Sequence, residues 1–208
     1  MVVDGGSDQT YELASSFPVY VISHPYNMGY GAALQSGYKF AVKQGYTHVL
    51  QFDADGQHNP CDLATIIDAF RTGNADVVLG SRFLATTFYP GAGKMIAIRF
   101  FRLLIRLITG NKITDPTSGL RGVSAKVFRY FSHIDRFPSD YPDADILIQI
   151  LLMGGRVLEV PAGNRQRYEG TSMHSGWRPL LYIMKVVLSI FVVTVGYVVY
   201  GREKPFHE

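Results

Sequence analysis

The sequence HVLQFDADGQ, residues 48–57, joins a short apolar run to two aspartates that stand one residue apart. Residues 48–52 are too few for a helix and are bounded by polar stretches, so they predict a buried strand of a parallel sheet. Asp53 and Asp55 then follow at the carboxyl end of that strand. In open α/β sheets this edge binds ligands, and alternate residues of an extended chain project to the same side. The stretch therefore predicts an α/β fold with its chemistry at this edge.

Two carboxylates at one edge can share a divalent cation. Mg²⁺ is usually held by one or two carboxylates, with substrate phosphate oxygens and water completing its shell, and Gln57 can add a neutral oxygen. A calcium loop of the EF-hand type is an alternative, but it needs glycine and a carboxylate where this chain has His58 and Ala64. A second alternative is an acidic turn that caps a helix after Pro60. Taken alone, the two aspartates favour the cap, and the rest of the chain favours the cation.

The composition is that of a globular protein with an apolar bias. The 208 residues are 47% hydrophobic and 18% charged, which suffices for one buried core. The formal net charge of +3 comes without a block rich in Lys and Arg, so nucleic-acid binding is not predicted. A single cysteine, Cys61, excludes an internal disulfide, and no Cys/His spacing resembles a zinc site. The sequence shows no signal-peptide pattern.

Strand and helix patterns alternate along the chain. Strands are expected at residues 2–3, 19–22, 48–52, 75–80 and 156–161. Helices are expected through residues 11–14, then over 29–45, 60–72, 91–109, 125–131 and 141–154, with a turn-rich loop over 111–122. This alternation predicts one domain built on a mostly parallel sheet flanked by helices.

Two apolar segments indicate contact with a membrane. In the helix expected over 91–109, Arg99, Arg102 and Arg106 share one face, which suits either a membrane interface or a core helix with a solvated basic stripe. Residues 180–200 are 21 residues with one charge, Lys185, and their uncharged stretch, 186–200, has 15, which is borderline against the roughly 20 residues that span a bilayer. We therefore divide the chain into a domain over 1–175 and an apolar, membrane-associating helix and tail over 176–208; a core helix remains the alternative for the tail. Candidate interfacial anchors flank the tail at both ends: Trp177, Arg178, Tyr182, Arg202 and Lys204.

Six separate motifs follow one another in an order that resembles a known family. They are DGGSDQT at 4–10, NMGYGAALQSG at 27–37, DADGQ at 53–57, LGSR at 79–82, DPTSGLRG at 115–122 and RYEGTS at 167–172. In this order and spacing the chain resembles family 2 glycosyltransferases, in particular those that load a sugar onto a polyprenyl phosphate, as dolichyl-phosphate mannose synthases do. The resemblance covers nearly the whole chain.

The resemblance implies a fold, a reaction and a location. The fold would be the Rossmann-like GT-A fold of nucleotide-diphospho-sugar transferases, with Mg²⁺ or Mn²⁺ at the diphosphate. The reaction would be an inverting transfer to a polyprenyl phosphate, undecaprenyl or dolichyl, for cell-envelope glycan synthesis or glycosylation. A UDP-sugar is the favoured donor and GDP-mannose the alternative. The enzyme would work at the membrane with its catalytic domain in the cytoplasm, with a small membrane protein or a second copy as a candidate partner and no nucleic acid.

The resemblance also implies roles for individual residues. On the donor side it implies nucleotide contacts by Asp4, Asn27, Gly31 and Asp53, and metal contacts by Asp53, Asp55 and Gln57. On the acceptor side it implies catalytic carboxylates at Asp115 and Asp145, and contacts to the acceptor phosphate by Arg82, Arg167 and Ser172.

The chain departs from the family pattern at its amino end. The family has one further strand and helix there, which carry a Y-N-E motif, and that strand would lie in the middle of the sheet. Asp145 also stands where many relatives have glutamate. The departure supports a rival function, an inactive, truncated homologue that acts as a binding or assembly partner. A nucleotidyltransferase is a third interpretation, but it would need a glycine-rich phosphate loop near the start.

Overall fold

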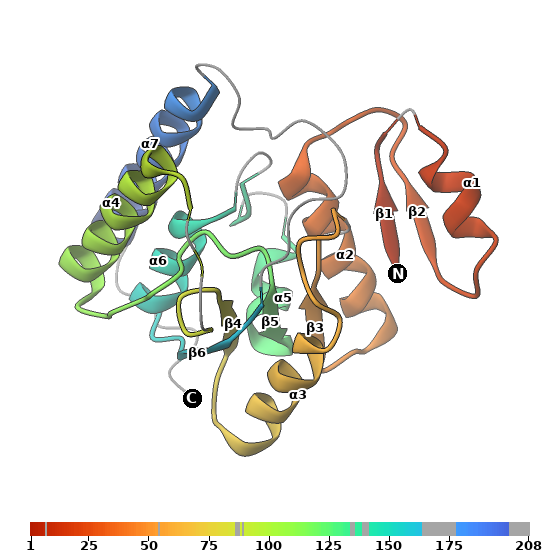
Figure 1. Ribbon diagram of the computed structural model, residues 1–208, viewed down its shortest axis with the longest axis horizontal. Helices are drawn as coiled ribbons and strands as arrows, with labels where there is room; N and C mark the ends of the chain where they lie inside the picture. The colour runs from red at the N-terminus through yellow and green to blue at the C-terminus, as the bar shows by residue number, and fades with distance from the viewer. Residues whose placement is uncertain are drawn as a thin grey trace.

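The computed structural model describes residues 1–6, 8–53, 55–85, 88, 90–133, 136–138, 142–163 and 178–199, with the backbone alone described for 2–4 and 178–180. The strands are β1 (Val2–Asp4), β2 (Val21–Ser23), β3 (His48–Gln51), β4 (Val77–Ser81), β5 (Arg121–Ser124) and β6 (Val157–Pro161) (Figure 1). The helices are α1 (Thr10–Ser15), α2 (Tyr30–Gln44), α3 (Asp62–Thr72), α4 (Ala92–Thr109), α5 (Ala125–Phe131), α6 (Ala144–Leu152) and α7 (Arg178–Val199). Most expected elements are confirmed to within two residues, and α6 is shorter than expected at both ends.

The larger sheet has four strands in the order β3-β5-β4-β6. β4 and β6 are parallel, whereas β5 runs antiparallel to both of its neighbours, β3 and β4. The sequence did not predict β5, because a four-residue strand that contains glycine gives a weak signal. Gly122 is required by packing, since a Cβ there would lie 2.4 Å from a ring carbon of Phe70 and 2.5 Å from a methyl carbon of Ile66. Helix α3 therefore packs directly on the backbone of β5.

The smaller sheet consists of β1 and β2, which pair in parallel. Among the described strands, β1 is hydrogen-bonded to β2 alone and β3 to β5 alone, so each has a neighbour on one side only. Helix α2 packs against both β1 and β3 and connects the two sheets (Figure 1). The single sheet expected from the sequence is thus divided between its second and third strands.

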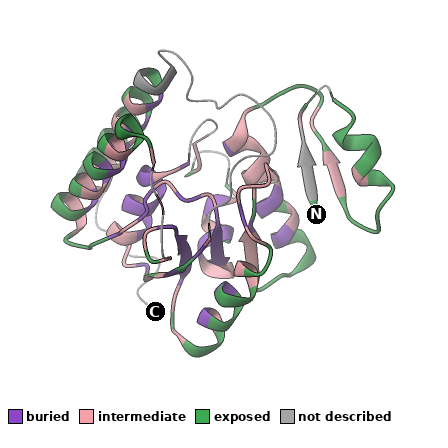
Figure 2. Ribbon diagram, in the orientation of Figure 1, coloured by how far each residue is buried: buried purple, intermediate pink, exposed green. Residues whose placement is uncertain are grey.

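The core lies on both faces of the four-stranded sheet. Every residue of β4 is buried, and successive side chains face opposite layers: Val77 packs with the α2, α5 and α6 side, and Val78 with α3. This explains why the strand reads as a continuous apolar run rather than an alternating one. Figure 2 shows the buried residues gathered at this sheet and its helices, whereas α1 has no fully buried residue.

Helix α7 packs against α4 and α6 beside this core. Tyr182, Val186 and Ile190, spaced four residues apart, are buried in a cluster with Phe101 of α4 and Leu147 of α6. Eight of the sixteen other described α7 side chains are both exposed and apolar. By length and composition, Leu181–Val199 could cross a membrane, and it is the one such helix among the described residues.

Candidate functional site

The polar motifs meet at one edge of the four-stranded sheet. Asp53 follows β3, and Arg82 follows β4, at the carboxyl ends of these strands. Because β5 is antiparallel, its first residue, Arg121, lies opposite Gln51 at the end of β3 and Leu79 near the end of β4. The loop that precedes β5, with Asp115, therefore reaches the same edge. This is how a strand that the sequence did not predict brings DPTSG to the DADGQ turn.

Asp53 is held by residues from three separate segments. The Tyr30 hydroxyl, at the start of α2, donates to Oδ1 at 2.8 Å, and Nε2 of His58 lies 3.5 Å from Oδ2. Gly119 lies so close that a Cβ there would be 2.1 Å from Oδ2. Burial by itself raises the pKa of Asp53, but the contacts of His58 and Tyr30 outweigh burial and leave the pKa below its ordinary value. Asp53 is therefore an oriented carboxylate held in its charged form.

Asp55 and Gln57 lie in the turn after Asp53. The backbone N–H of Gln57 donates to Oδ1 of Asp55 at 3.0 Å, and Gly56 between them has a φ of 78°, which favours glycine. In the described part of the chain, no group of three or more His, Cys, Asp or Glu side chains gathers as a metal site. Two carboxylates and an amide nevertheless supply the oxygen ligands that a hard divalent cation takes when a substrate phosphate and water complete its shell.

Arg82 and Asp115 are each other's partners. Nε and Nη2 of Arg82 donate to the two carboxylate oxygens of Asp115 at 2.6 and 2.7 Å, and Nη2 also reaches Thr117. The two residues are 6% and 0% exposed. Glu159 of β6 accepts the backbone N–H groups of Thr114 and Asp115 and so fixes the start of the loop. The structure brings together the predicted phosphate-binding arginine and the predicted catalytic carboxylate as a buried, bidentate ion pair.

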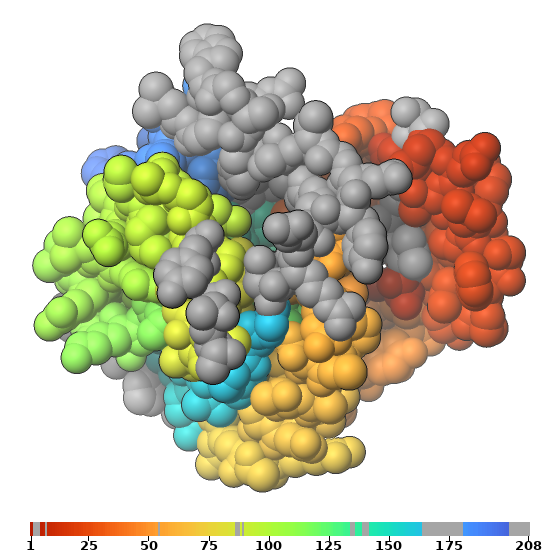
Figure 3. Space-filling view, in the orientation of Figure 1, coloured from red at the N-terminus to blue at the C-terminus, as the bar shows by residue number. Residues whose placement is uncertain are grey.

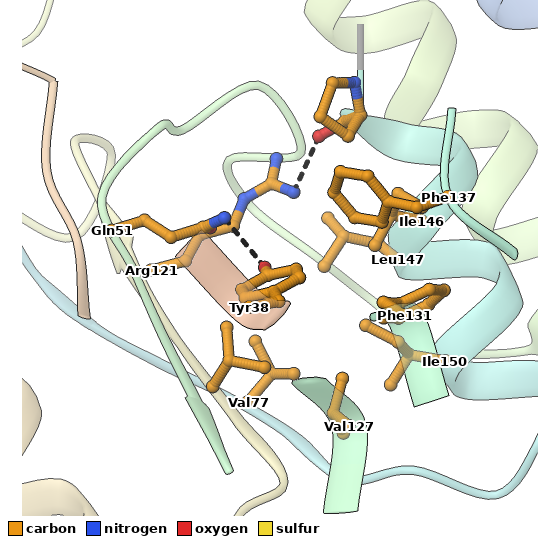
Figure 4. Close-up of a pocket in the computed structure, with 12 residues that line it drawn as sticks. Tyr38, Gln51, Val77, Arg121, Val127, Phe131, Phe137, Ile146, Leu147 and Ile150 are labelled. Carbon is orange, nitrogen blue, oxygen red and sulfur yellow. Dashed lines mark hydrogen bonds between the residues drawn. The ribbon is translucent and has the colours of Figure 1, made fainter. Parts of the chain in front are cut away.

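Arg121 connects this loop to α6, and the sequence analysis assigned it no role. Its side chain donates to the carbonyl oxygens of Pro116, Ser118 and Pro142 and to Oδ1 of Asp143, at 2.8 to 3.4 Å. Figure 4 shows its guanidinium above a small, largely apolar pocket, with the bond to Pro142 and a separate bond from Gln51 to the Tyr38 hydroxyl. The signal available in the sequence was the position of Arg121 inside the motif DPTSGLRG.

Asp145 is buried between α6 and α7. Oδ1 accepts the backbone N–H groups of Asp143 and Ile146, both at 2.9 Å, and Oδ2 accepts the Ser189 hydroxyl at 2.5 Å. Burial raises its pKa to about 6, although the hydrogen bond from Ser189 acts in the opposite direction. Asp143 is similarly placed, since its Oδ2 accepts the Tyr182 hydroxyl at 2.5 Å.

The remaining predicted site residues are only partly described. Asn27 accepts the backbone N–H of Gly29 at 3.0 Å, and Gly31 is buried in the first turn of α2. Asp4 ends β1, but its side chain is outside the described set. Arg167 and Ser172 lie in the undescribed stretch 164–177, which follows β6. Their predicted roles stay predictions.

The fold and the carboxylate-lined edge define a glycosyltransferase of the GT-A class. A glucosyl-3-phosphoglycerate synthase of Mycobacterium tuberculosis, solved with Mn²⁺ and UDP-glucose, superposes with a TM-score of 0.63 at 18% identity, covering 94% of this chain and 67% of that one. Residues 1–131 match the sequence profile of Glycosyl transferase family 2.

Two curated relatives extend the similarity beyond residue 131. An undecaprenyl-phosphate mannosyltransferase of Micrococcus luteus is 32% identical over 83% of this chain and 72% of its own length. A polyprenol monophosphomannose synthase of Mycolicibacterium smegmatis is 29% identical over 85% of this chain and 70% of its own. The chain belongs to glycosyl transferase family 2 and is a glycosyltransferase.

Proposed function

We propose that this glycosyltransferase moves a sugar from a nucleotide-diphospho-sugar to a polyprenyl phosphate at a membrane. The observation that carries the proposal is the turn after β3, where Asp53 is oriented by Tyr30 and His58 and Asp55 follows two residues later. The names of the relatives, which are undecaprenyl-phosphate and polyprenol mannosyltransferases, support the acceptor class. The neighbouring structure with UDP-glucose and the mannose-transferring relatives support the two donors expected from the sequence, a UDP-sugar and GDP-mannose.

The donor would bind between the amino end of α2 and the DADGQ turn. Asp55 and Gln57 would hold Mg²⁺ or Mn²⁺, with Asp53 contacting either the cation or the ribose. When bound, the cation neutralises charge that develops on the departing diphosphate. Asn27 and Gly31 would line the nucleotide cleft, and Asp4 would contact the base. Asp53 is already ionised and held in place, so it needs no rearrangement to contact a ribose hydroxyl or a cation.

The acceptor phosphate would be the nucleophile. One of its oxygens would form a bond to the anomeric carbon while the bond from that carbon to the diphosphate breaks, which inverts the anomeric configuration and releases a nucleoside diphosphate. A phosphate is already ionised at neutral pH, so the step needs little help from a general base and depends on positioning and charge neutralisation. We propose Arg167 and Ser172 as phosphate ligands. Arg82 would act beside them, although Nε and Nη2 of Arg82 are engaged by Asp115.

We propose that α4 and α7 form the membrane-binding surface. The two helices lie side by side at one margin of the molecule (Figures 1 and 3). They expose large apolar side chains together, among them Ile96, Leu103, Leu107, Leu188 and Phe191. Arg99 and Arg106 are exposed on α4, and the described parts of both helices contain no acidic residue. Apolar groups flanked by arginines suit a lipid surface with anionic headgroups.

The proposed function is tested first at the cation. Asp55→Ala should abolish the gain in affinity for a UDP-sugar that Mn²⁺ provides, because the diphosphate then lacks its bridge to the protein. Titration calorimetry with and without Mn²⁺ measures this gain, and UDP-sugar and GDP-mannose titrations with the unsubstituted protein identify the base. Asp68→Ala, on the exposed face of α3, is the matched control. Unchanged Mn²⁺ dependence in Asp55→Ala would remove Asp55 from the site.

The membrane surface is tested by flotation with vesicles. Leu188→Asp and Phe191→Asp should weaken binding to all vesicles, because each places a charge on the exposed apolar face. Arg99→Gln with Arg106→Gln should weaken binding only to vesicles that contain anionic lipid. A point substitution is preferable to deletion of the tail, since α7 also covers the core. Equal binding by all variants would refute the surface.

One observation favours the rival function of a binding or assembly partner. Among the described strands, β1 and β3 each pair on one side only, so the sheet beside the proposed nucleotide site is divided. A chain that binds nucleotide-sugar in the calorimeter and transfers no sugar would support the rival. A chain that transfers sugar would exclude it.

A further inference from the structure

The face of α7 that packs on α6 carries two hydroxyl groups among apolar side chains. Tyr182 and Ser189 are seven positions apart, two helical turns, so they lie on the same face of α7 as the buried Val186 and Ile190. Each hydroxyl donates to a carboxylate at the start of α6: Tyr182 to Asp143, which immediately precedes the helix, and Ser189 to Asp145 in its first turn, both at 2.5 Å. The apolar helix thus reaches the acceptor-side carboxylates through two specific bonds.

These bonds complete the hydrogen bonding of two carboxylates whose other oxygens are already engaged. Oδ1 of Asp145 accepts two backbone N–H groups, and Oδ1 of Asp143 accepts Arg121. Loss of a donor to a buried carboxylate costs more than loss of an average hydrogen bond. Apolar contacts alone would allow α7 to pack on α6 in several positions. The two hydroxyls can donate to both carboxylates in only one of these positions.

The contacts continue from α6 to the donor side. Asp143 is bonded to Arg121, and Arg121 also holds the carbonyl oxygens of Pro116 and Ser118 in the DPTSG loop. The next residue of that loop, Gly119, lies against Asp53. Arg121 therefore lies between the α7 contacts at Asp143 and the loop beside Asp53.

We propose that Tyr182 and Ser189 are positioning residues of the transferase, which make the docking of α7 on α6 a condition for placing Asp143 and Asp145. The opposite face of α7, with Leu188, Phe191 and Val192, is exposed and belongs to the proposed membrane surface. One helix thus carries the proposed lipid contacts on one side and the contacts to Asp143 and Asp145 on the other. This inference rests on the proposed function.

The test uses matched substitutions on one helix. Tyr182→Phe and Ser189→Ala remove the two hydroxyls and keep the apolar packing. Tyr197→Phe and Thr194→Val are the controls, because the Thr194 hydroxyl donates to the carbonyl oxygen of Ile190 in its own helix and Tyr197 lies farther along α7. Hydrogen exchange of the peptide over 142–152 should quicken in Tyr182→Phe and Ser189→Ala and stay unchanged in the controls.

Transfer kinetics give the second measurement. The two variants should lower kcat by ~10-fold to ~100-fold, as misplaced reacting groups do, and leave nucleotide-sugar affinity and vesicle binding unchanged. In Ser189→Ala the acidic limb of the pH profile should also move to higher pH, because the hydroxyl lowers the pKa of Asp145. Among the described residues, the titratable groups coupled to Asp145 are Asp143 and Tyr182, and Arg121 is bonded to Asp143; Ser189→Ala retains all three.

Each outcome decides between the alternatives. Unchanged exchange over 142–152 overturns the inference, and so does faster exchange with an unaltered kcat and pH profile, which would mean that the hydroxyls only stabilise the fold. If the unsubstituted protein binds nucleotide-sugar and transfers nothing, the proposed function is wrong, and the exchange measurement alone decides whether the hydroxyls hold the carboxylates.

Discussion

The carboxylates on the proposed donor side and the proposed acceptor side of the site are held in different ways. On the proposed donor side Asp53 and Asp55 are half-buried, and the groups bonded to them include a tyrosine, a histidine and a backbone N–H. On the acceptor side Asp115 and Asp145 are 0% and 1% exposed. Asp115 faces a guanidinium, and Asp145 accepts three hydrogen bonds.

This difference predicts which substitutions change ligand binding and which change stability. A half-buried carboxylate can exchange water for a cation or a sugar hydroxyl at little cost. A buried carboxylate is already hydrogen-bonded or ion-paired, and its removal leaves those partners unsatisfied. Substitutions on the donor side should therefore change affinity more than stability, and substitutions on the acceptor side should do the reverse.

The largest effect on stability is expected for Asp115→Asn. The substitution leaves the charge of Arg82 buried without its partner, so the free energy of unfolding should fall by about 3 to 5 kcal/mol. Denaturant titration measures the change. The double variant Arg82→Met with Asp115→Leu should lose less than the single one, because it removes both charges together. A loss below about 1 kcal/mol, as for a surface pair, would contradict the comparison.

A smaller effect on stability is expected for Gly119→Ala. Its Cβ would meet Oδ2 of Asp53 at 2.1 Å, so the carboxylate must move away from Tyr30 or His58. We expect weaker binding of nucleotide-sugar together with a loss of about 1 to 3 kcal/mol, the usual cost of overpacking. Gly93→Ala in α4 is the control, because nothing lies within 4 Å of its Cβ. If Gly119→Ala binds as tightly as the unsubstituted protein, the position of Asp53 does not matter for the donor.

The parts of the fold that follow from local pattern could be predicted from the sequence. The run at 48–52 and the aspartates after it form one strand and one turn, and α4, α5 and α7 begin and end close to their expected positions. Each of these depends on neighbouring residues, on helical periodicity or on a turn that glycine permits.

The missed features depend on residues that are distant in the sequence. Strand β5 exists because Gly122 lets α3 pack on its backbone, which the sequence of β5 alone does not show. The division of the sheet between β1 and β3 depends on which strands pair with each other, and the residue pattern within a single strand does not show this. The bond between Tyr182 and Asp143 joins residues 39 positions apart. From the sequence, the acidic residues at the start of α6 therefore indicate an interaction with the helix dipole, and a contact with α7 could not be predicted.

The smallest effect is the pH dependence that Asp145 contributes to stability. Its pKa is raised from 3.8 to about 6 in the folded protein, mainly by burial, so the folded state binds this proton more tightly than the unfolded state does. Stability is therefore lost as pH rises through this range. Between pH 5 and pH 7 the loss from this one group is about 1 kcal/mol. Asp53 has its pKa shifted downward, stays ionised over this interval and adds nothing to the difference.

Asp145→Asn keeps the shape of the side chain and removes the titration. Its unfolding free energy should therefore fall by about 1 kcal/mol less between pH 5 and pH 7 than that of the unsubstituted protein, and denaturant titrations at the two pH values give this difference directly. The contributions of the other titrating groups to this change cancel, because both proteins contain them. Asp68→Asn is the control, since Asp68 is an exposed residue of α3 paired with Arg71 at the surface. Parallel pH dependence in the unsubstituted protein and Asp145→Asn would mean that Asp145 titrates like a solvated carboxylate, which would contradict the pKa shift attributed to its burial.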